Sequence, residues 1–404
     1  MKIDIMRKID LWCGIPLTFF LSILYKVKHL FFKTKFTERP KNILFIELSE
    51  MGSTVIADPA MQKAKKQFQA NLFFLIFSKN KISLSLLKTV PNENICVIRE
   101  NNLFVFVCDV LSFFIWARRK KIDTIIDLEL FSRATALLSG LSGAKYRVGF
   151  CAFHNEGLYR GSFLTHNVVY NPHQHMVKNF MALVYALESN NNEVPYTKRQ
   201  IDDKDIVLQK AIVSEESKAI VLTKIQKVCP SFQKHQNRLV LINPNASDLL
   251  PQRIWPQDHF KALIQNILAT YPDIFVLITG APRERNGAQI LCNKVSDPRC
   301  LNFAGNVEFL ELLPLYELSS LMVTNDSGPG HFSAVTLLQT IVLFGPETSA
   351  LYGSLGNSTP ISLNLACSPC VSAANHRKTA CSDNVCLKQM QPSKVMKEIK
   401  RILN

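Results

Sequence analysis

From residue 42 onward, short runs of β-branched and aromatic residues alternate with longer stretches of helical periodicity. This alternation restricts the fold more than any other feature, because it is typical of a parallel sheet covered by helices. In the first half, the pattern predicts strands at residues 42–48, 71–77, 94–98, 122–128 and 145–149. It predicts helices at residues 59–69, 103–120, 132–141 and 175–189.

The pattern lapses between residues 190 and 237, where 211–227 is still compatible with one helix, and then it restarts. The second half predicts strands at 238–243, 274–279, 300–303, 321–324 and 340–344, with helices at 256–269, 283–295, 308–319 and 330–337. A chain of 404 residues has room for two domains. We therefore expect an α/β protein with two doubly wound domains, residues 42–200 and 238–404, joined by a linker at 201–237.

The N-terminal 41 residues combine basic charge with apolar side chains. They hold nine Lys and Arg against three acids, in a chain whose net charge is +15. No nucleic-acid-binding module accompanies this charge, which instead flanks the apolar and aromatic residues 11–25. That stretch is shorter than the roughly 20 residues needed to span a bilayer as a helix. It also lacks a signal-peptide cleavage site.

We therefore expect residues 1–41 to be a membrane-associating segment that lies in the plane of an anionic membrane surface, and we expect no nucleic-acid partner. The alternative is an amphipathic helix packed on the first domain.

Eleven cysteines, an odd number at irregular spacing, indicate a reducing cytosol rather than a disulfide framework. Cys367, Cys370, Cys381 and Cys386 form a Cys-rich stretch at 367–386 whose spacing resembles parts of zinc sites. The alternative is a set of buried thiols that pack as small apolar groups. We predict no required metal and keep zinc at these four cysteines as the alternative.

Ligands of doubly wound domains bind outside the carboxyl ends of the strands, so the loops there matter most. The loop after the first strand contains Glu50, Gly52 and Ser53, where Gly52 permits close approach of a ligand to the backbone. Asp58 and Pro59 are expected to cap and begin the following helix. Neither a Walker loop nor GxGxxG is present, which argues against P-loop enzymes and dehydrogenases.

In the second half, two loops have the composition of an anion site. Ser247 and Arg253 follow one strand, and a hydroxyl with a cation can hold a phosphate. The motif TNDSGPGH at 324–331 stands before a small-residue helix, so its backbone amides favour a pyrophosphate, with Ser327 as the expected cap. Asp326 would then face sugar hydroxyls or a metal. The alternative is a capped helix start without a ligand.

Several motifs together resemble glycosyltransferase family 9, the ADP-heptose:lipopolysaccharide heptosyltransferase family. They occur in order as NILFIELSEMGS with DPA, INPNAS with RIWP, TGAPRER, TNDSGPGH, LFGPE and the C-terminal cysteine stretch. The resemblance implies a GT-B fold of two facing Rossmann-like domains, with the acceptor on the N-terminal one and the nucleotide-sugar on the C-terminal one. It implies inverting transfer of a sugar, expected to be heptose from ADP-heptose, to the lipopolysaccharide core. The enzyme would work as a peripheral or monotopic protein at the cytoplasmic face of the inner membrane, without a cofactor.

The same resemblance assigns residues. It places donor binding on Ser247, Arg253, Glu284, Asp326, Ser327, Gly328, Gly330 and His331. The family has an Asp as general base directly after Gly52, where this chain has Ser53. A serine hydroxyl cannot accept a proton near neutral pH, so we expect Glu50 to replace the base, ahead of Asp58 and Glu47.

The expected catalytic residues are therefore Glu50, Ser53 and Asp326. Because of Ser53, two alternatives stay open: the same fold with another nucleotide-sugar, or a catalytically impaired membrane-bound protein that only binds one.

Overall fold

The protein was analysed as a computed structural model that describes residues 3–31, 38–154, 157–189, 193, 195–247, 249–372, 375 and 377–404. The chain divides into two compact units, Met1–Val207 and Leu208–Asn404. The division lies inside the 201–237 stretch. Each unit has its own parallel sheet and its own core, and each is described by itself.

The first unit contains a six-stranded parallel sheet in the order β3-β2-β1-β4-β5-β6. Its strands are β1 (Asn42–Ile46), β2 (Asn71–Phe77), β3 (Ile95–Ile98), β4 (Thr124–Asp127), β5 (Tyr146–Cys151) and β6 (His166–Val169). The central strands are buried along almost their whole length. Their nearly continuous apolar runs follow from burial on both faces of the sheet.

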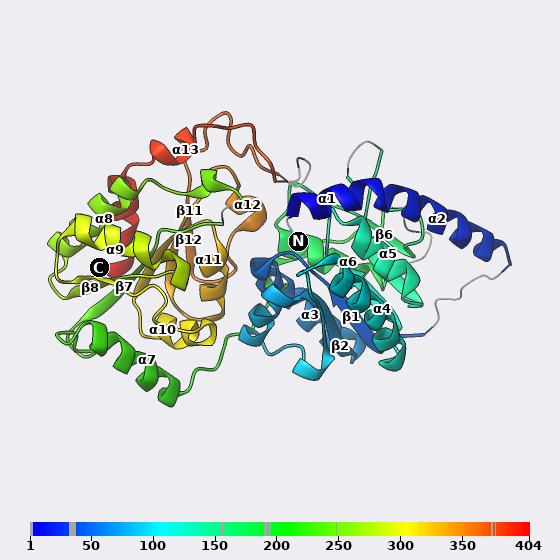
Figure 1. Cartoon of the computed structure of the whole chain (residues 1–404), viewed down its shortest axis with the longest axis horizontal. Coiled ribbons are helices and arrows are strands. Elements are labelled where there is room, and N and C mark those ends of the chain that lie inside the picture. Colours follow the sequence, from blue (N-terminus) through cyan, green and yellow to red (C-terminus); the bar gives the residue numbers. More distant parts are fainter. Residues whose placement is uncertain are drawn as a thin grey trace. The chain divides into compact units, whose positions relative to one another are not determined.

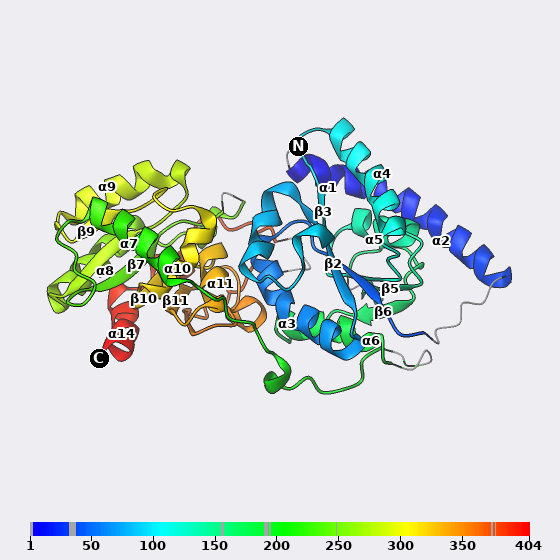
Figure 2. The ribbon, with the colours of Figure 1, turned by 90° about the horizontal axis from the view of Figure 1, so that it is seen from below.

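Six helices belong to the first unit: α1 (Ile3–Trp12), α2 (Gly14–Phe31), α3 (Met51–Phe68), α4 (Leu103–Arg119), α5 (Arg133–Leu141) and α6 (Met176–Ala186). Helix α3 packs against α6, whereas α5 packs against both α2 and α4 (Figures 1 and 2). Asn102 and Ser132 begin α4 and α5, since each side chain accepts a hydrogen bond from an amide of the first turn.

The second unit repeats the same sheet topology, with the order β12-β11-β10-β7-β8-β9. Its strands are β7 (Arg238–Asn243), β8 (Ile274–Ile278), β9 (Cys300–Asn302), β10 (Leu321–Asn325), β11 (Gln339–Leu343) and β12 (Ser358–Ile361). Its helices are α7 (Glu215–Val228), α8 (Gln257–Thr270), α9 (Arg285–Val295), α10 (Leu312–Glu317), α11 (Gly328–Phe332), α12 (Ser349–Tyr352), α13 (Val385–Lys388) and α14 (Pro392–Leu403). Helix α7 packs on α10, so much of the 201–237 stretch is folded onto this unit (Figure 1).

The start of α3 differs from the prediction. The helix begins at Met51, eight residues before the predicted start at 59, and Pro59 lies inside it. Asp58 does not cap the helix; it is fully buried and accepts a hydrogen bond from the Thr89 hydroxyl. The buried apolar face that includes Val55 and Met61 is continuous across the proline and outweighs its missing amide.

The N-terminal helices α1 and α2 pack on the first unit along one side only. Gly14, Thr18 and Ser22 of α2 are buried toward α5. The Tyr25 hydroxyl donates to the Gly140 carbonyl at 2.7 Å, and the Ser162 amide donates to Ser22 Oγ at 2.8 Å. The segment Ile5–Phe31 is long and apolar enough to cross a membrane. The contacts of Ser22 and Tyr25 nevertheless hold α2 against the first unit.

Candidate active site

In each sheet the strand order reverses between two neighbouring central strands. The reversal lies between β1 and β4 in the first unit, and between β7 and β10 in the second. In open parallel sheets, ligands bind outside the carboxyl ends of the strands at such a reversal. The loops predicted to carry chemistry follow β1, β7 and β10.

Asn325, at the end of β10, holds both ends of the connection between β7 and α8. Its side-chain oxygen accepts from the Trp255 amide at 3.1 Å, and its side-chain nitrogen donates to the Pro244 carbonyl at 2.8 Å. Trp255 is fully buried and donates from Nε1 to the Met390 carbonyl at 2.9 Å. The loop that carries Arg253 is therefore fixed against the end of β10.

Arg253 lies in a buried network of opposite charges. Its Nη2 atom is 2.7 Å from a carboxylate oxygen of Glu347, and its Nε atom is 3.6 Å from Asp326 Oδ2. The other Glu347 oxygen is 3.5 Å from Nε of Arg377. Burial raises the pKa of Glu347 to about 7; Arg377 and Arg253 oppose this shift, and Asp326 adds to it. The network shows how Asp326 can lie beside an anion site, because Arg253 stands next to it.

The TNDSGPGH motif forms the short helix α11, but Ser327 does not cap it with its side chain. The Ser327 hydroxyl donates to the Asn325 carbonyl at 3.1 Å instead of accepting from a helix amide. The two glycines allow close packing, since a Cβ at Gly328 would lie 2.9 Å from the Phe332 ring and one at Gly330 would lie 3.3 Å from Val342. His331 follows on the same turn, half-buried.

Glu284 and Ser247 flank this network at greater exposure. A Glu284 carboxylate oxygen accepts from the Ala281 amide at 2.7 Å. A Cβ at Gly280 would meet both the Glu284 carboxylate and the Asn245 amide, so these side chains approach each other across that glycine. Ser247 is exposed, and its Oγ accepts from the Leu249 amide at 3.3 Å.

The Cys-rich stretch supports the Arg253 loop through its backbone and Asn384. Gln252 donates to the Cys381 carbonyl at 2.9 Å, and Asn384 donates to the Gln252 and Ile254 carbonyls at 3.0 Å. Within the described ranges, no three His, Cys, Asp or Glu side chains gather as a metal site. Cys370 Sγ instead lies 3.3 Å from the Thr379 hydroxyl, and Cys381 donates to the Asp383 carbonyl. Burial raises the pKa of Cys386, and the charges of Cys370, Cys381 and Cys367 add to this shift, so the four cysteines lie near one another.

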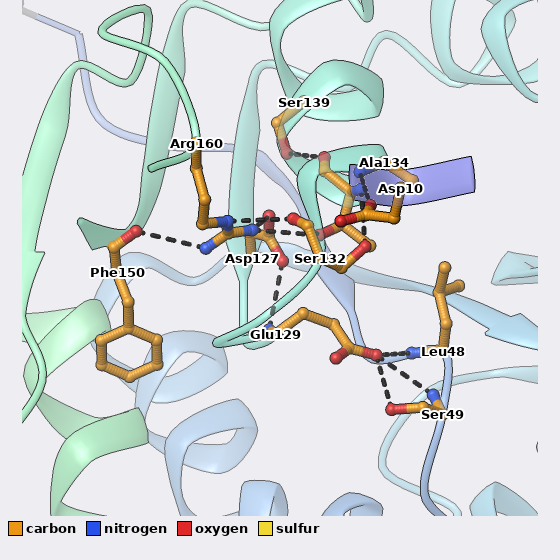
Figure 3. A network of polar contacts seen from close by, with 11 residues as sticks. Asp10, Leu48, Ser49, Asp127, Glu129, Ser132, Ala134, Ser139, Phe150 and Arg160 are labelled. Atoms are coloured by element: carbon orange, nitrogen blue, oxygen red, sulfur yellow. Dashed lines mark hydrogen bonds and ion pairs between the residues drawn. The ribbon is translucent and has the colours of Figure 1, made fainter. Parts of the chain in front are cut away.

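In the first unit, Glu129 connects the ends of β4 and β1 (Figure 3). Its Oε1 atom accepts from the Leu48 amide at 3.0 Å, the Ser49 amide at 3.1 Å and the Ser49 hydroxyl at 2.9 Å. Burial raises the pKa of Glu129; the Ser49 hydrogen bond opposes the shift, and the charges of Asp127 and Glu50 add to it. Asp127 is fully buried and paired with Arg160.

Glu50 and Ser53 lie together at the start of α3. Glu50 occupies the N-cap position, Gly52 lies in the first turn, and the Ser53 hydroxyl donates to Glu50 Oε2 at 3.2 Å. A carboxylate is therefore next to Ser53, the residue at the position where the resembled family has its general-base Asp.

Sequence reasoning assigned no role to Glu129. It named Glu347 only as part of the LFGPE loop at 343–347, which could close the same cleft. Both residues lie in loops that follow parallel strands, β4 and β11, and this position was the available signal.

Comparisons with known proteins identify the family. A family model described as glycosyltransferase family 9 (heptosyltransferase) matches residues 111–380. The chain belongs to this family. The protein is therefore a glycosyltransferase, and its two units have the GT-B architecture expected from the sequence.

Relatives and solved structures of family 9 match most of the chain. Lipooligosaccharide heptosyltransferase 2 of Campylobacter jejuni is 25% identical over 374 residues, which cover 89% of this chain and 98% of that protein. Lipopolysaccharide core heptosyltransferase OpsX of Haemophilus influenzae is 23% identical, over 80% and 85% of the two chains. The structure of E. coli ADP-heptose lipopolysaccharide heptosyltransferase II has a TM-score of 0.67 at 18% identity, over 90% of this chain and 98% of that one. E. coli heptosyltransferase WaaC with ADP has a TM-score of 0.60 at 15% identity, over 89% and 99%.

Proposed function

We propose that this family 9 member is an inverting heptosyltransferase that moves heptose from ADP-heptose to a lipopolysaccharide core acceptor. The observation that carries the proposal is the Arg253, Asp326 and Glu347 network at the strand reversal of the second unit. The relatives named as lipooligosaccharide or lipopolysaccharide heptosyltransferases support the sugar and the acceptor, and neighbours bound to ADP or a fluorinated ADP-heptose support the donor.

On the donor side, Arg253 and the amides at the start of α11 hold the diphosphate. Arg253 Nε lies 3.6 Å from Asp326 Oδ2, and charge-assisted hydrogen bonds from a guanidinium suit a leaving diphosphate. Asp326 accepts from the sugar hydroxyls, while Glu284 lies toward the nucleoside with Ser247 at the exposed rim. Arg253 offsets the repulsion between Asp326 and the diphosphate. The scheme uses no metal.

On the acceptor side, Glu50 accepts the proton of the attacking hydroxyl. It is the carboxylate in contact with Ser53, whose hydroxyl donates to it and holds its orientation. Glu129 is the second candidate, because its Oε1 takes three hydrogen bonds and burial raises its pKa toward the range in which a base is effective. Asp58 is excluded by its buried contact with Thr89.

We place the acceptor on residues 42–200 and the donor on residues 238–404, with the linker between them. Residues 1–41 hold the protein on the cytoplasmic face of the inner membrane as a peripheral or monotopic enzyme. The exposed aromatic side chains Trp12, Phe20 and Phe31 support this location.

The deciding experiment incubates purified full-length protein with ADP-heptose and a lipopolysaccharide core lacking its heptose, followed by mass spectrometry. We expect a gain of one heptose, together with release of ADP. Transfer from another nucleotide-sugar but not from ADP-heptose would contradict the donor. Tight binding of ADP-heptose without any transfer would instead identify a binding protein that has lost the base.

A further inference from the structure

Helix α4 exposes a row of large apolar side chains on the side that faces away from the core. Phe113 and Ala117 are buried toward the sheet. The exposed residues, here called the α4 row, are Leu103, Phe104, Val107, Leu111 and Ile115, with exposed fractions between 47% and 78%. Four of them recur at every fourth position, so they lie along one side of the helix. Single exposed apolar residues are ordinary, but a contiguous row marks an interaction surface.

Helices α1 and α2 expose a second row on the same helical layer. The α2 row consists of Trp12, Leu17, Phe20, Leu24, Val27, Leu30 and Phe31. Helix α5 packs against α2 on one side and against α4 on the other, as Figures 1 and 2 show. Met6 of α1 also packs on the core cluster that Phe106 and Phe114 of α4 contact. Helices α1, α2, α5 and α4 are therefore neighbours within the first unit.

Exposed basic residues lie at the ends of both rows. Lys26 and Lys28 stand among the residues of the α2 row, while Arg118 and Arg119 end α4 and Lys121 follows it. The acid of α4, Asp109, is paired with Arg99 at 2.7 Å. Apolar and aromatic side chains bordered by exposed cations match the boundary between acyl chains and anionic headgroups.

We propose that the α4 row and the α2 row together form one membrane-contact face that takes an anionic phospholipid bilayer. A single amphipathic helix would leave the folded unit free to rotate about that helix. A second contact on α4, which belongs to the folded unit itself, removes this freedom. The carboxyl edge of the first sheet is then held at a fixed orientation to the lipid. The proposal goes beyond the N-terminal segment and does not depend on the identity of the transferred sugar.

The test compares full-length variants in co-sedimentation with vesicles of equal parts phosphatidylcholine and phosphatidylglycerol. Phe104→Glu with Leu111→Glu places two carboxylates on the α4 row. Ile220→Glu with Ile290→Glu makes the same change at exposed positions of the second unit and serves as the matched control. We expect the α4 variant to lose at least about tenfold in partition to these vesicles and the control to lose little. Both variants should retain ADP binding and the wild-type melting temperature.

Four outcomes would overturn the proposal. Wild-type partition of the α4 variant, alongside loss in Phe20→Glu with Leu24→Glu, would leave the α2 row as the whole contact. Equal loss in the second-unit control would show that net charge, and not the α4 row, governs binding. A change from oligomer to monomer in the α4 variant, with vesicle binding intact, would make the row a protein interface. Equal partition of the wild type to phosphatidylcholine alone would contradict the role of the basic residues.

Discussion

Arg253 lies between the carboxylates of Asp326 and Glu347, so its removal should change both ADP binding and stability. Arg253→Ala should weaken ADP binding by about 1.5 to 3 kcal/mol, because a charge-assisted hydrogen bond to the diphosphate is lost. It also leaves Glu347 buried without the guanidinium 2.7 Å away, so the fold is destabilised. Arg253→Ala with Glu347→Gln is the matched control, since it removes that stranded charge. Calorimetric titration with ADP measures the effect, and unchanged affinity in both variants would remove Arg253 from the donor site.

Replacing each carboxylate by its amide distinguishes the two candidate general bases, Glu50 and Glu129. Glu50→Gln should lower kcat by about 10² to 10⁴, the usual contribution of a general base, with little change in ADP affinity. Glu129→Gln keeps an oxygen that can accept from Leu48 and Ser49, so we expect a smaller loss. Ser53→Ala is the control for the orienting hydrogen bond. If Glu129→Gln loses more than Glu50→Gln and removes the acidic limb of the pH–rate profile, Glu129 is the base.

Glu347 should make stability depend on pH. Its pKa is raised from 4.5 to about 7 in the folded protein, so the folded state binds a proton more readily than the unfolded state between these values. The free energy of unfolding therefore falls as pH rises from about 4.5 to about 7, by at most about 3 kcal/mol, and this contribution is constant above. Glu347→Gln removes this pH-dependent loss of stability. The melting temperature of the variant should therefore rise relative to that of the wild type as pH increases from about 4.5 to about 7.

Glu311 provides the control of opposite sign for this measurement. Burial tends to raise the pKa of Glu311, but the hydrogen bond and charge of Lys224, together with the hydrogen bond from the Glu308 amide, hold it below the ordinary value. Its contribution to stability is present above pH 4.5 and is lost as pH falls further. Glu311→Gln should therefore show no gain between pH 4.5 and 7. An equal gain in both variants would contradict the assignment of this pH dependence to Glu347.

At the scale of elements, the sequence predicted all the central strands and the edge strands β3 and β9, but it missed the other two edge strands. Strands β2 and β7 have the predicted bounds because both faces are buried, which requires an uninterrupted apolar run. The edge strands β6 and β12 were not predicted. Their sequences, HNVV and STPI, are short and partly polar because one side of an edge strand lacks a neighbour. Helix α14 was also not predicted.

The sequence predicted those site residues that lie in a motif forming the loop after a strand. Arg253 and Asp326 came from such loops, and the structure places them 3.6 Å apart at the nearest atoms. The sequence also placed the loop that contains Glu347 near this cleft. The ion pair of Glu347 with Arg253 was not predicted, because it depends on β11 lying next to β10, which no local pattern contains. In the same way, the contact of Glu129 with Ser49 joins positions 80 residues apart. Contacts between residues this far apart in the sequence follow from the order of the strands in the sheet, and the spacing of motifs along the chain does not predict them.

A partly buried ion pair contributes to the attachment of α1 to the folded unit. Asp10 is 3.2 Å from Arg133 and also accepts from the Ala134 amide at 2.8 Å. Asp10→Ala should lower the free energy of unfolding by about 3 kcal/mol, because the Arg133 side chain is only 7% exposed and would keep an unpaired charge. Asp10→Ala with Arg133→Met should recover part of that loss. Lys8→Ala, at an exposed position of α1, is the control, and chemical denaturation measures all three.

At the scale of the whole molecule, two sheets with separate cores predict that the two units unfold in two separate thermal transitions. Met1–Val207 and Leu208–Asn404 each complete a six-stranded sheet from their own residues. A ligand stabilises only what it binds, by about 2.7 kcal/mol at a hundredfold excess over its Kd. ADP should therefore raise the calorimetric transition of the second unit alone, and Arg253→Ala should remove that rise. Asp10→Ala should lower only the transition of the first unit. One cooperative transition that ADP raises and Asp10→Ala lowers as a whole would show that the two units unfold as one.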